Sequence, residues 1–121
     1  TVVSYKNKIL PKASNLKTAT NCLNILSGKK HTVYGGICLH YPNGLYIIKC
    51  SISKVKFCKL SKIEKQYYLK SNEWKSKAGG YAIQGIASSF VKKISGSYTN
   101  IVGIDTFMVR KLFKKLGLID E

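Results

Sequence analysis

Acidic residues are scarce in this sequence of 121 residues, where five aspartates and glutamates stand against 21 lysines and arginines. Arginine is scarce too, since Arg110 is the only one, and the net charge is +16. With so few carboxylates, no pair has the look of a general acid and a general base. A strong positive charge is typical of proteins that bind nucleic acid or nucleotide phosphates, but lysines on a solvated face need no partner. Charge alone leaves both interpretations open.

Long apolar runs and metal-binding motifs are also missing. No stretch approaches the ~18–20 apolar residues of a membrane-spanning helix, and the first residues lack the basic and then apolar order of a signal peptide. A soluble, cytoplasmic protein without membrane contacts is therefore the expectation. The four cysteines include no C-x-x-C pair and the two histidines complete no zinc pattern, so we expect free, reduced thiols and no metal held by side chains.

Apolar residues make up 45% of the chain, which is enough for the core of one domain over residues 1–121. The order of local signals predicts an α/β chain with a mixed sheet flanked by helices. The pair Gly35-Gly36, inside an expected strand, indicates a bulge or a close approach of the backbone. Strands are expected on both sides of a turn at Lys6-Asn7 within residues 1–10, over residues 31–40, over residues 45–50 with continuation to 57, and over residues 90–94.

Three helices follow from their capping residues. Ser14 is expected to cap the first, whose apolar residues 16, 19, 23 and 26 share one face and which ends near Gly28. Ser61 and Glu64 form a capping box for the second, which runs to about residue 70. Asp105 is expected to cap the last helix. The apolar side chains expected to face inward from that helix are Met108, Val109, Leu112, Phe113 and Leu116.

Two glycine-containing segments are candidates for ligand binding. In residues 77–85, Lys-Ala-Gly-Gly-Tyr-Ala-Ile-Gln-Gly, the glycines let the backbone approach a ligand closely. Lys77 offers a point charge for a phosphate, and the Gln84 amide suits the edge of a base. Residues 96–103, Gly-Ser-Tyr-Thr-Asn-Ile-Val-Gly, fit a tight turn without a ligand. A solvated glycine-rich loop is the alternative for the first segment.

Four parts of the sequence resemble motifs of the Maf family in the family's order. Residues 1–3 with 9–12, Thr-Val-Val and Ile-Leu-Pro-Lys, resemble Asp-Thr-Val-Val followed by Ile-Leu-Gly-Lys-Pro. Residues 26–34 resemble Leu-Ser-Gly-Arg-x-His-x-Val-Tyr. Residues 77–85 resemble Lys-Ala-Gly-Ala-Tyr-Gly-Ile-Gln-Gly, and residues 96–103 resemble Gly-Ser-Tyr-Ser-Asn-Val-Val-Gly. One such match is weak, but four in order over nearly the whole chain are specific.

The resemblance implies a function and a fold. Maf proteins are nucleoside triphosphate pyrophosphatases, which release pyrophosphate and leave the monophosphate with the help of a divalent cation, usually Mg²⁺. Their α/β, inosine-triphosphatase-like architecture holds the nucleotide in a cleft, often within a homodimer. Lys12 falls on the family's phosphate-binding lysine, and Lys77 is a further expected ligand contact. Thr1 and Gln84 fall on positions that separate subfamilies and match the branch that prefers dTTP and UTP.

Departures from the family pattern set the alternatives. The family's catalytic aspartate comes immediately before the position of Thr1, and its Ser-x-Ser-x-Arg-Arg phosphate loop is further upstream. We therefore expect the C-terminal two-thirds of a Maf domain, with no catalytic residue of its own and little or no activity alone. Smaller departures are Gly35 for Thr, Ser76 for Asp and Asp105 for Pro. An inactive gene remnant and a basic nucleic-acid-binding module, whose binding would ignore Gln84, are the other readings.

Overall fold

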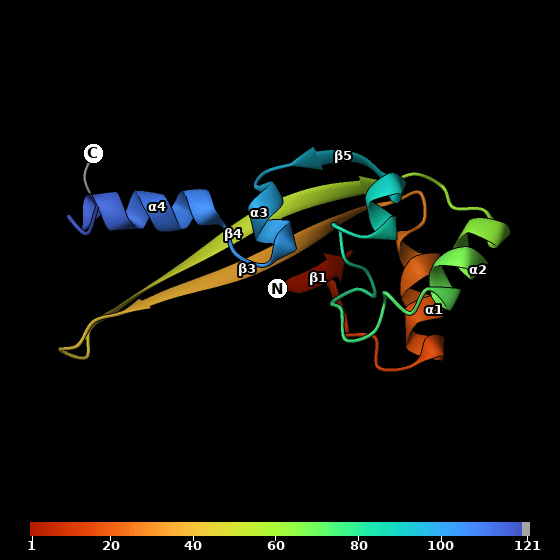
Figure 1. Ribbon diagram of the computed structural model, residues 1–121, viewed down its shortest axis with the longest axis horizontal. Helices are drawn as coiled ribbons and strands as arrows, with labels where there is room; N and C mark the ends of the chain where they lie inside the picture. The colour runs from red at the N-terminus through yellow and green to blue at the C-terminus, as the bar shows by residue number, and fades with distance from the viewer. Residues whose placement is uncertain (120–121) are drawn as a thin grey trace.

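The computed structural model describes residues 1–119, which form a five-stranded sheet with helices along it (Figure 1). The strand order is β2-β1-β3-β4-β5. The strands are β1 (Val2–Tyr5), β2 (Lys8–Leu10), β3 (Lys30–His40), β4 (Tyr46–Phe57) and β5 (Val91–Ser95). The helices are α1 (Leu16–Leu26), α2 (Lys62–Lys70), the 3-10 helix η1 (Ile86–Phe90), α3 (Tyr98–Val102) and α4 (Thr106–Lys115).

The expected α/β chain with a sheet flanked by helices is confirmed, but strand direction differs from the expectation of a mixed sheet. All four strand pairs in the described part of the chain are antiparallel. Antiparallel neighbours need only a hairpin between them, whereas a parallel pair needs a long crossover. The chain has hairpins and also a crossover, which follows β2 and carries α1. This crossover still gives an antiparallel pair, because it returns the chain so that β3 pairs with β1 in the antiparallel sense.

Local capping signals predicted most boundaries correctly. Lys6 and Asn7 both have positive φ, as the tight turn between β1 and β2 requires. Both hydrogen bonds of the capping box at α2 are present, and the Asp105 side chain accepts from the backbone N–H of Met108 at the start of α4. The expected cap at Ser14 is wrong. The next residue, Asn15, caps α1 by accepting from the Thr18 N–H at 2.9 Å, because the helix begins one residue later.

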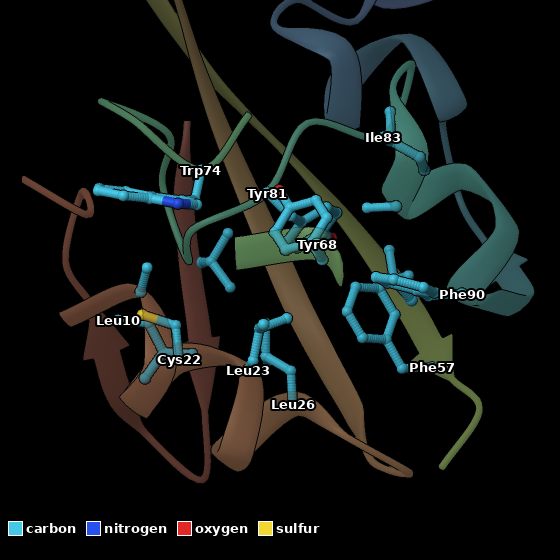
Figure 2. Packing of buried hydrophobic residues seen from close by; sticks show 14 of the residues in the cluster. Leu10, Cys22, Leu23, Leu26, Phe57, Tyr68, Trp74, Tyr81, Ile83 and Phe90 are labelled. Atoms are coloured by element: carbon cyan, nitrogen blue, oxygen red, sulfur yellow. The ribbon is translucent and has the colours of Figure 1, made fainter. Parts of the chain in front are cut away.

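The hydrophobic core lies on one face of the sheet (Figure 2). From the two long strands, Val33, Val55 and Phe57 point into it, and they pack with residues of α1, α2 and the segment 71–90. Aromatic rings fill its centre: Phe57 meets Tyr81 edge-on at 4.9 Å between centroids, and Tyr68 meets Phe90 at 5.6 Å. Leu16, the first residue of the apolar face expected for α1, is exposed. Cys22, which was not part of that expected face, is buried.

The opposite face of the sheet is bare in the described residues, and β3 and β4 extend beyond the core as a long two-stranded arm (Figure 1). The final helix, α4, lies over this arm and not over the main core. The side chains expected to face inward from this helix are therefore less buried than expected. Only Leu112 is buried; Met108, Val109, Phe113 and Leu116 are half-buried. No described helix is long and apolar enough to cross a membrane.

Candidate functional site

A pocket of about 270 Å³ lies beside the start of β1 and brings together all four side chains selected from the sequence. Thr1, Lys12, Lys77 and Gln84 lie on its rim and are exposed. The remaining lining residues are Val3, Val33, Ser76, Ala78, Tyr81, Ala82, Ile83, Ile101 and Val102. The rim is therefore polar and the floor apolar, which is the usual construction of a small-molecule site.

Backbone pairing joins the segment of Lys12 to the loop that carries Lys77. Residues 11–13 run antiparallel to residues 76–79, with an isolated bridge between Lys12 and Ala78. The Ala13 N–H donates to the Lys77 carbonyl at 3.2 Å, and the Gly79 N–H donates to the Pro11 carbonyl at 3.2 Å. Because the residues on both sides of Lys12 are bonded to this loop, the backbone of Lys12 is fixed beside the segment that carries Lys77.

The glycines of this loop are needed for close packing. Gly79 has φ +67°, and a Cβ added there would meet the Val3 side chain at 2.9 Å. Gly80 has φ +79°, and its carbonyl accepts a hydrogen bond of 2.8 Å from the Tyr68 hydroxyl. The loop is thus fixed against β1 and α2, contrary to the interpretation of a solvated glycine-rich loop.

A buried histidine–tyrosine pair supports the pocket floor, and no motif reasoning pointed to it as a pair. His31 Nε2 and the Tyr81 hydroxyl are 2.6 Å apart, and the His31 ring also meets Phe57 edge-on. Burial lowers the pKa of His31 to about 4, and burial raises the pKa of Tyr81 above its usual range. Both groups are therefore neutral at pH 7, and the contact is a hydrogen bond between uncharged side chains.

The segment 96–103 was expected to be a tight turn, but it contains the short helix α3. Ser97 caps α3 by accepting from the Asn100 N–H at 3.0 Å. The Asn100 side chain is fully buried, and its Nδ2 lies 3.2 Å from the carbonyl oxygens of Val33 and Ser51. This anchor fixes α3 across β3 and β4, so that Ile101 and the following residue line the pocket. Ser97 itself was the signal for this cap, because serine is a preferred N-cap residue.

The chemistry of the pocket suits phosphate binding better than acid–base catalysis. Two lysines stand on the rim, and no aspartate, glutamate, histidine or cysteine is among the lining residues. The lysines would attract an anion, and the Gln84 amide both donates and accepts hydrogen bonds. Within residues 1–119, no group of three or more metal-ligating side chains is found. The described residues thus provide binding groups, but no base at the pocket that would activate water.

Comparison with known proteins shows the family of the chain. The family model described as Maf-like protein matches residues 1–116. A protein of Mesorhizobium japonicum named dTTP/UTP pyrophosphatase is 50% identical over 107 residues, which cover 88% of this chain and 51% of the relative. A Paramagnetospirillum magneticum protein of the same name is 47% identical over 117 residues, covering 97% of this chain and 62% of the relative.

A third relative gives the same picture of coverage. The dTTP/UTP pyrophosphatase of a Chelativorans strain is 51% identical over 104 residues, which are 86% of this chain and 50% of that protein. The chain therefore spans about half the length of the curated relatives it matches. The family-model match over residues 1–116 nevertheless includes every residue that lines the pocket. On these grounds the chain belongs to the Maf-like protein family.

Proposed function

We propose that the pocket binds a nucleoside triphosphate, with dTTP and UTP preferred, and that it belongs to a nucleoside triphosphate pyrophosphatase. The observation that carries this proposal is the meeting of Thr1, Lys12, Lys77 and Gln84 around one pocket, although they come from separate parts of the chain. The printed names of the relatives, dTTP/UTP pyrophosphatase, agree with it.

Each rim residue has a separate task in this proposal. Lys12 and Lys77 neutralise charge on the triphosphate, where pyrophosphate would leave. Gln84, in the same segment as Lys77, hydrogen-bonds to the edge of the base. Its amide both donates and accepts, which suits a pyrimidine such as uracil or thymine, since their edges offer both donors and acceptors. Thr1 adds a hydroxyl at the same rim. The apolar floor excludes water from the bound nucleotide, which strengthens the lysine–phosphate attraction.

Members of the family generally use a divalent metal, and the resemblance favours Mg²⁺. The lining residues by themselves do not fit a metal site, because hard cations are held in proteins mainly by carboxylates and the lining residues include none. The same absence of a carboxylate or an imidazole at the pocket leads us to propose that this chain alone binds nucleotide but hydrolyses it very slowly.

The test is to measure nucleotide binding and pyrophosphate release by the purified 121-residue chain. We expect dTTP and UTP to bind more tightly than dATP by calorimetric titration. Lys12→Ala removes a charge-assisted phosphate contact and should weaken dTTP binding by roughly 10- to 100-fold. Lys17→Ala, an exposed lysine on α1 away from the pocket, is the matched control and should leave binding unchanged.

Several results would contradict the proposal. Equal effects of Lys12→Ala and Lys17→Ala would mean that dTTP is held by net charge and not by the pocket. Gln84→Glu should change the preference among bases, because it replaces an amide donor with a carboxylate; an unchanged preference would remove Gln84 from base recognition. Complete absence of nucleotide binding would favour an inactive remnant. The homodimer typical of the family stays a prediction, which sedimentation of the chain would test.

A further inference from the structure

The bare face of the sheet carries an ordered arrangement of side chains that the nucleotide pocket does not use. The register of the strands places Lys30 opposite Lys56, and Lys56 opposite Lys93. These three residues, here called the lysine row, come from three adjacent strands and are all exposed. Neighbouring strands lie about 4.8 Å apart, so the row spans roughly 10 Å.

Two further rows lie beside the lysine row on the same face, because alternate residues of a strand share a face. The middle row is polar and is made of Ser4, Thr32, Lys54 and Ser95. The outer row is apolar and is made of Val2, Tyr34 and Ile52. Tyr34 is 37% exposed and Ile52 is 54% exposed. The face therefore changes from lysines through hydroxyls to an open aromatic ring over a few residues.

The lysine row is unfavourable for the isolated fold. Like charges directly opposite each other on neighbouring strands destabilise a sheet. None of the acidic residues that the structure describes relieves this repulsion, since Glu64 and Asp105 cap helices and Glu73 accepts a hydrogen bond from the Ile86 N–H in the segment after α2. A polyanion laid across the row would supply the missing negative charge.

We propose that this face binds single-stranded nucleic acid without sequence preference. The phosphates lie along the lysine row and the hydroxyls of the middle row, and a base stacks on the Tyr34 ring. Sequence-independent binding follows from the residue types: lysine is a point charge, and stacking accepts any base. Arg110, the residue type that reads base edges best, lies on α4 and not on this face.

This site is independent of the proposed nucleotide pocket. In β1, Val2 belongs to the bare face whereas Val3 lines the pocket, because successive residues of a strand point to opposite sides. A strand bound to the lysine row would therefore leave the pocket open. The inference goes beyond the proposed pyrophosphatase function, and either of the two can fail without the other.

The test uses fluorescence anisotropy of a short labelled oligodeoxyadenylate with the 121-residue chain over a series of salt concentrations. The row variant combines Lys30→Ser, Lys56→Ser and Lys93→Ser. The control variant combines Lys17→Ser, Lys62→Ser and Lys115→Ser, three exposed lysines away from this face. Each variant lowers the net charge from +16 by three, to +13, so general electrostatic attraction changes equally.

We expect the row variant to bind roughly 10- to 100-fold more weakly at about 0.1 M salt, while the control variant changes less than about threefold. The salt dependence should separate them as well. Each phosphate contact to a single strand adds about 0.7 to the slope of log K against log salt, so losing three contacts should lower the slope by about 2. Tyr34→Ser should weaken binding without changing that slope, because it removes stacking and no charge.

Lys56→Glu keeps the proposal testable if the triple variant does not fold. A glutamate between Lys30 and Lys93 relieves the repulsion, so the variant should melt at a higher temperature and yet lose oligonucleotide binding. Equal weakening by the row and control variants would overturn the proposal. The proposal would also be overturned if excess dTTP displaced the oligonucleotide, or if polyglutamate displaced it as well as unlabelled oligonucleotide does. Tighter binding to phosphatidylserine vesicles than to the oligonucleotide would overturn it too. Each of these results would indicate a different ligand for this face.

Discussion

Gly35 and Gly36 are adjacent glycines in β3 that we expect to respond in opposite ways to the same substitution. A Cβ added at Gly35 would overlap the Asn100 Oδ1, whereas a Cβ added at Gly36 meets nothing within 4 Å. Neither glycine has a positive φ, so backbone strain does not distinguish them. Gly35→Ala and Gly36→Ala are therefore a matched pair in which only the contact with Asn100 differs.

The magnitude follows from what Asn100 loses. Its Nδ2 lies within 3.2 Å of the Val33 and Ser51 carbonyl oxygens and 3.1 Å from the Ser53 hydroxyl. Withdrawing the side chain breaks two hydrogen bonds, since an amide nitrogen has two protons, at about 0.5–1.5 kcal/mol each. Replacing glycine by alanine in a strand returns about 0.5–1 kcal/mol. We expect Gly35→Ala to lower the free energy of unfolding by about 1–2 kcal/mol and Gly36→Ala to raise it by about 0.5 kcal/mol.

Urea unfolding followed by the fluorescence of Trp74, the single tryptophan, measures both variants. Equal stability of Gly35→Ala and Gly36→Ala would show that the Asn100 side chain does not contribute to the fold in this way. Asn100→Ala supplies a second check, because in that background Gly35→Ala should no longer be destabilising. Gly35→Ala should also weaken nucleotide binding, since Asn100 holds the helix whose Ile101 lines the pocket. The family's usual threonine at position 35 would likewise require Asn100 to turn away.

Three further predictions concern the histidine, the pocket loop and the last helix. The pKa of His31 is about 4 in the fold and 6.5 without burial, so the unfolded chain binds more protons between these values; stability should fall by up to about 3 kcal/mol as pH drops from 6.5 to 4, and urea titrations of His31→Gln should lack this loss. Gly79→Ala and Gly44→Ala both place alanine at positive φ, but only Gly79→Ala meets Val3, so only it should abolish dTTP binding by calorimetry. Asp105→Ala should lower stability by about 1–2 kcal/mol in thermal melts, and Asp105→Ser should restore most of it as an alternative cap.

Much of the fold was predictable because its boundaries depend on local chemistry. The capping box at Ser61 and the turn at Lys6 involve residues within three positions of each other, and both are present. Neighbouring candidates were harder to separate: Ser14 and Asn15 are equally good caps, and only the point where the helix begins selects Asn15.

The full length of β4 was obscured by buried polar residues. Ser51 and Ser53 occupy inward positions where apolar residues would have continued the alternation. They are tolerated there because each has a partner: the Ser51 hydroxyl donates to Asp105 at 2.6 Å, and the Ser53 hydroxyl donates to the Ser97 carbonyl at 2.7 Å. Both partners lie more than 40 positions away in the chain, so the pattern of β4 alone could not show that these serines face inward.

The pocket was predictable in its rim and not in its floor, for the same reason. Lys77 and Gln84 were selected from their own chemistry, and Thr1 and Lys12 from the family resemblance. His31 and Tyr81 are 50 positions apart, and their contact depends on how β3 lies against the segment after α2. Spacing within a segment contains no information about such a contact.

Strand register explains why one short segment serves both proposed sites. Val2 and Val3 are chemically identical neighbours, yet Val3 is buried in the pocket floor and Val2 is exposed beside Tyr34. A shift of β1 by one residue would exchange them, and it would also turn Ser4 toward the core. Burying Ser4 without a partner would be unfavourable, as would exposing Val3. The same energetic preference that closes the core therefore fixes which side chains of β1 face the nucleotide pocket and which join the bare face that carries the lysine row.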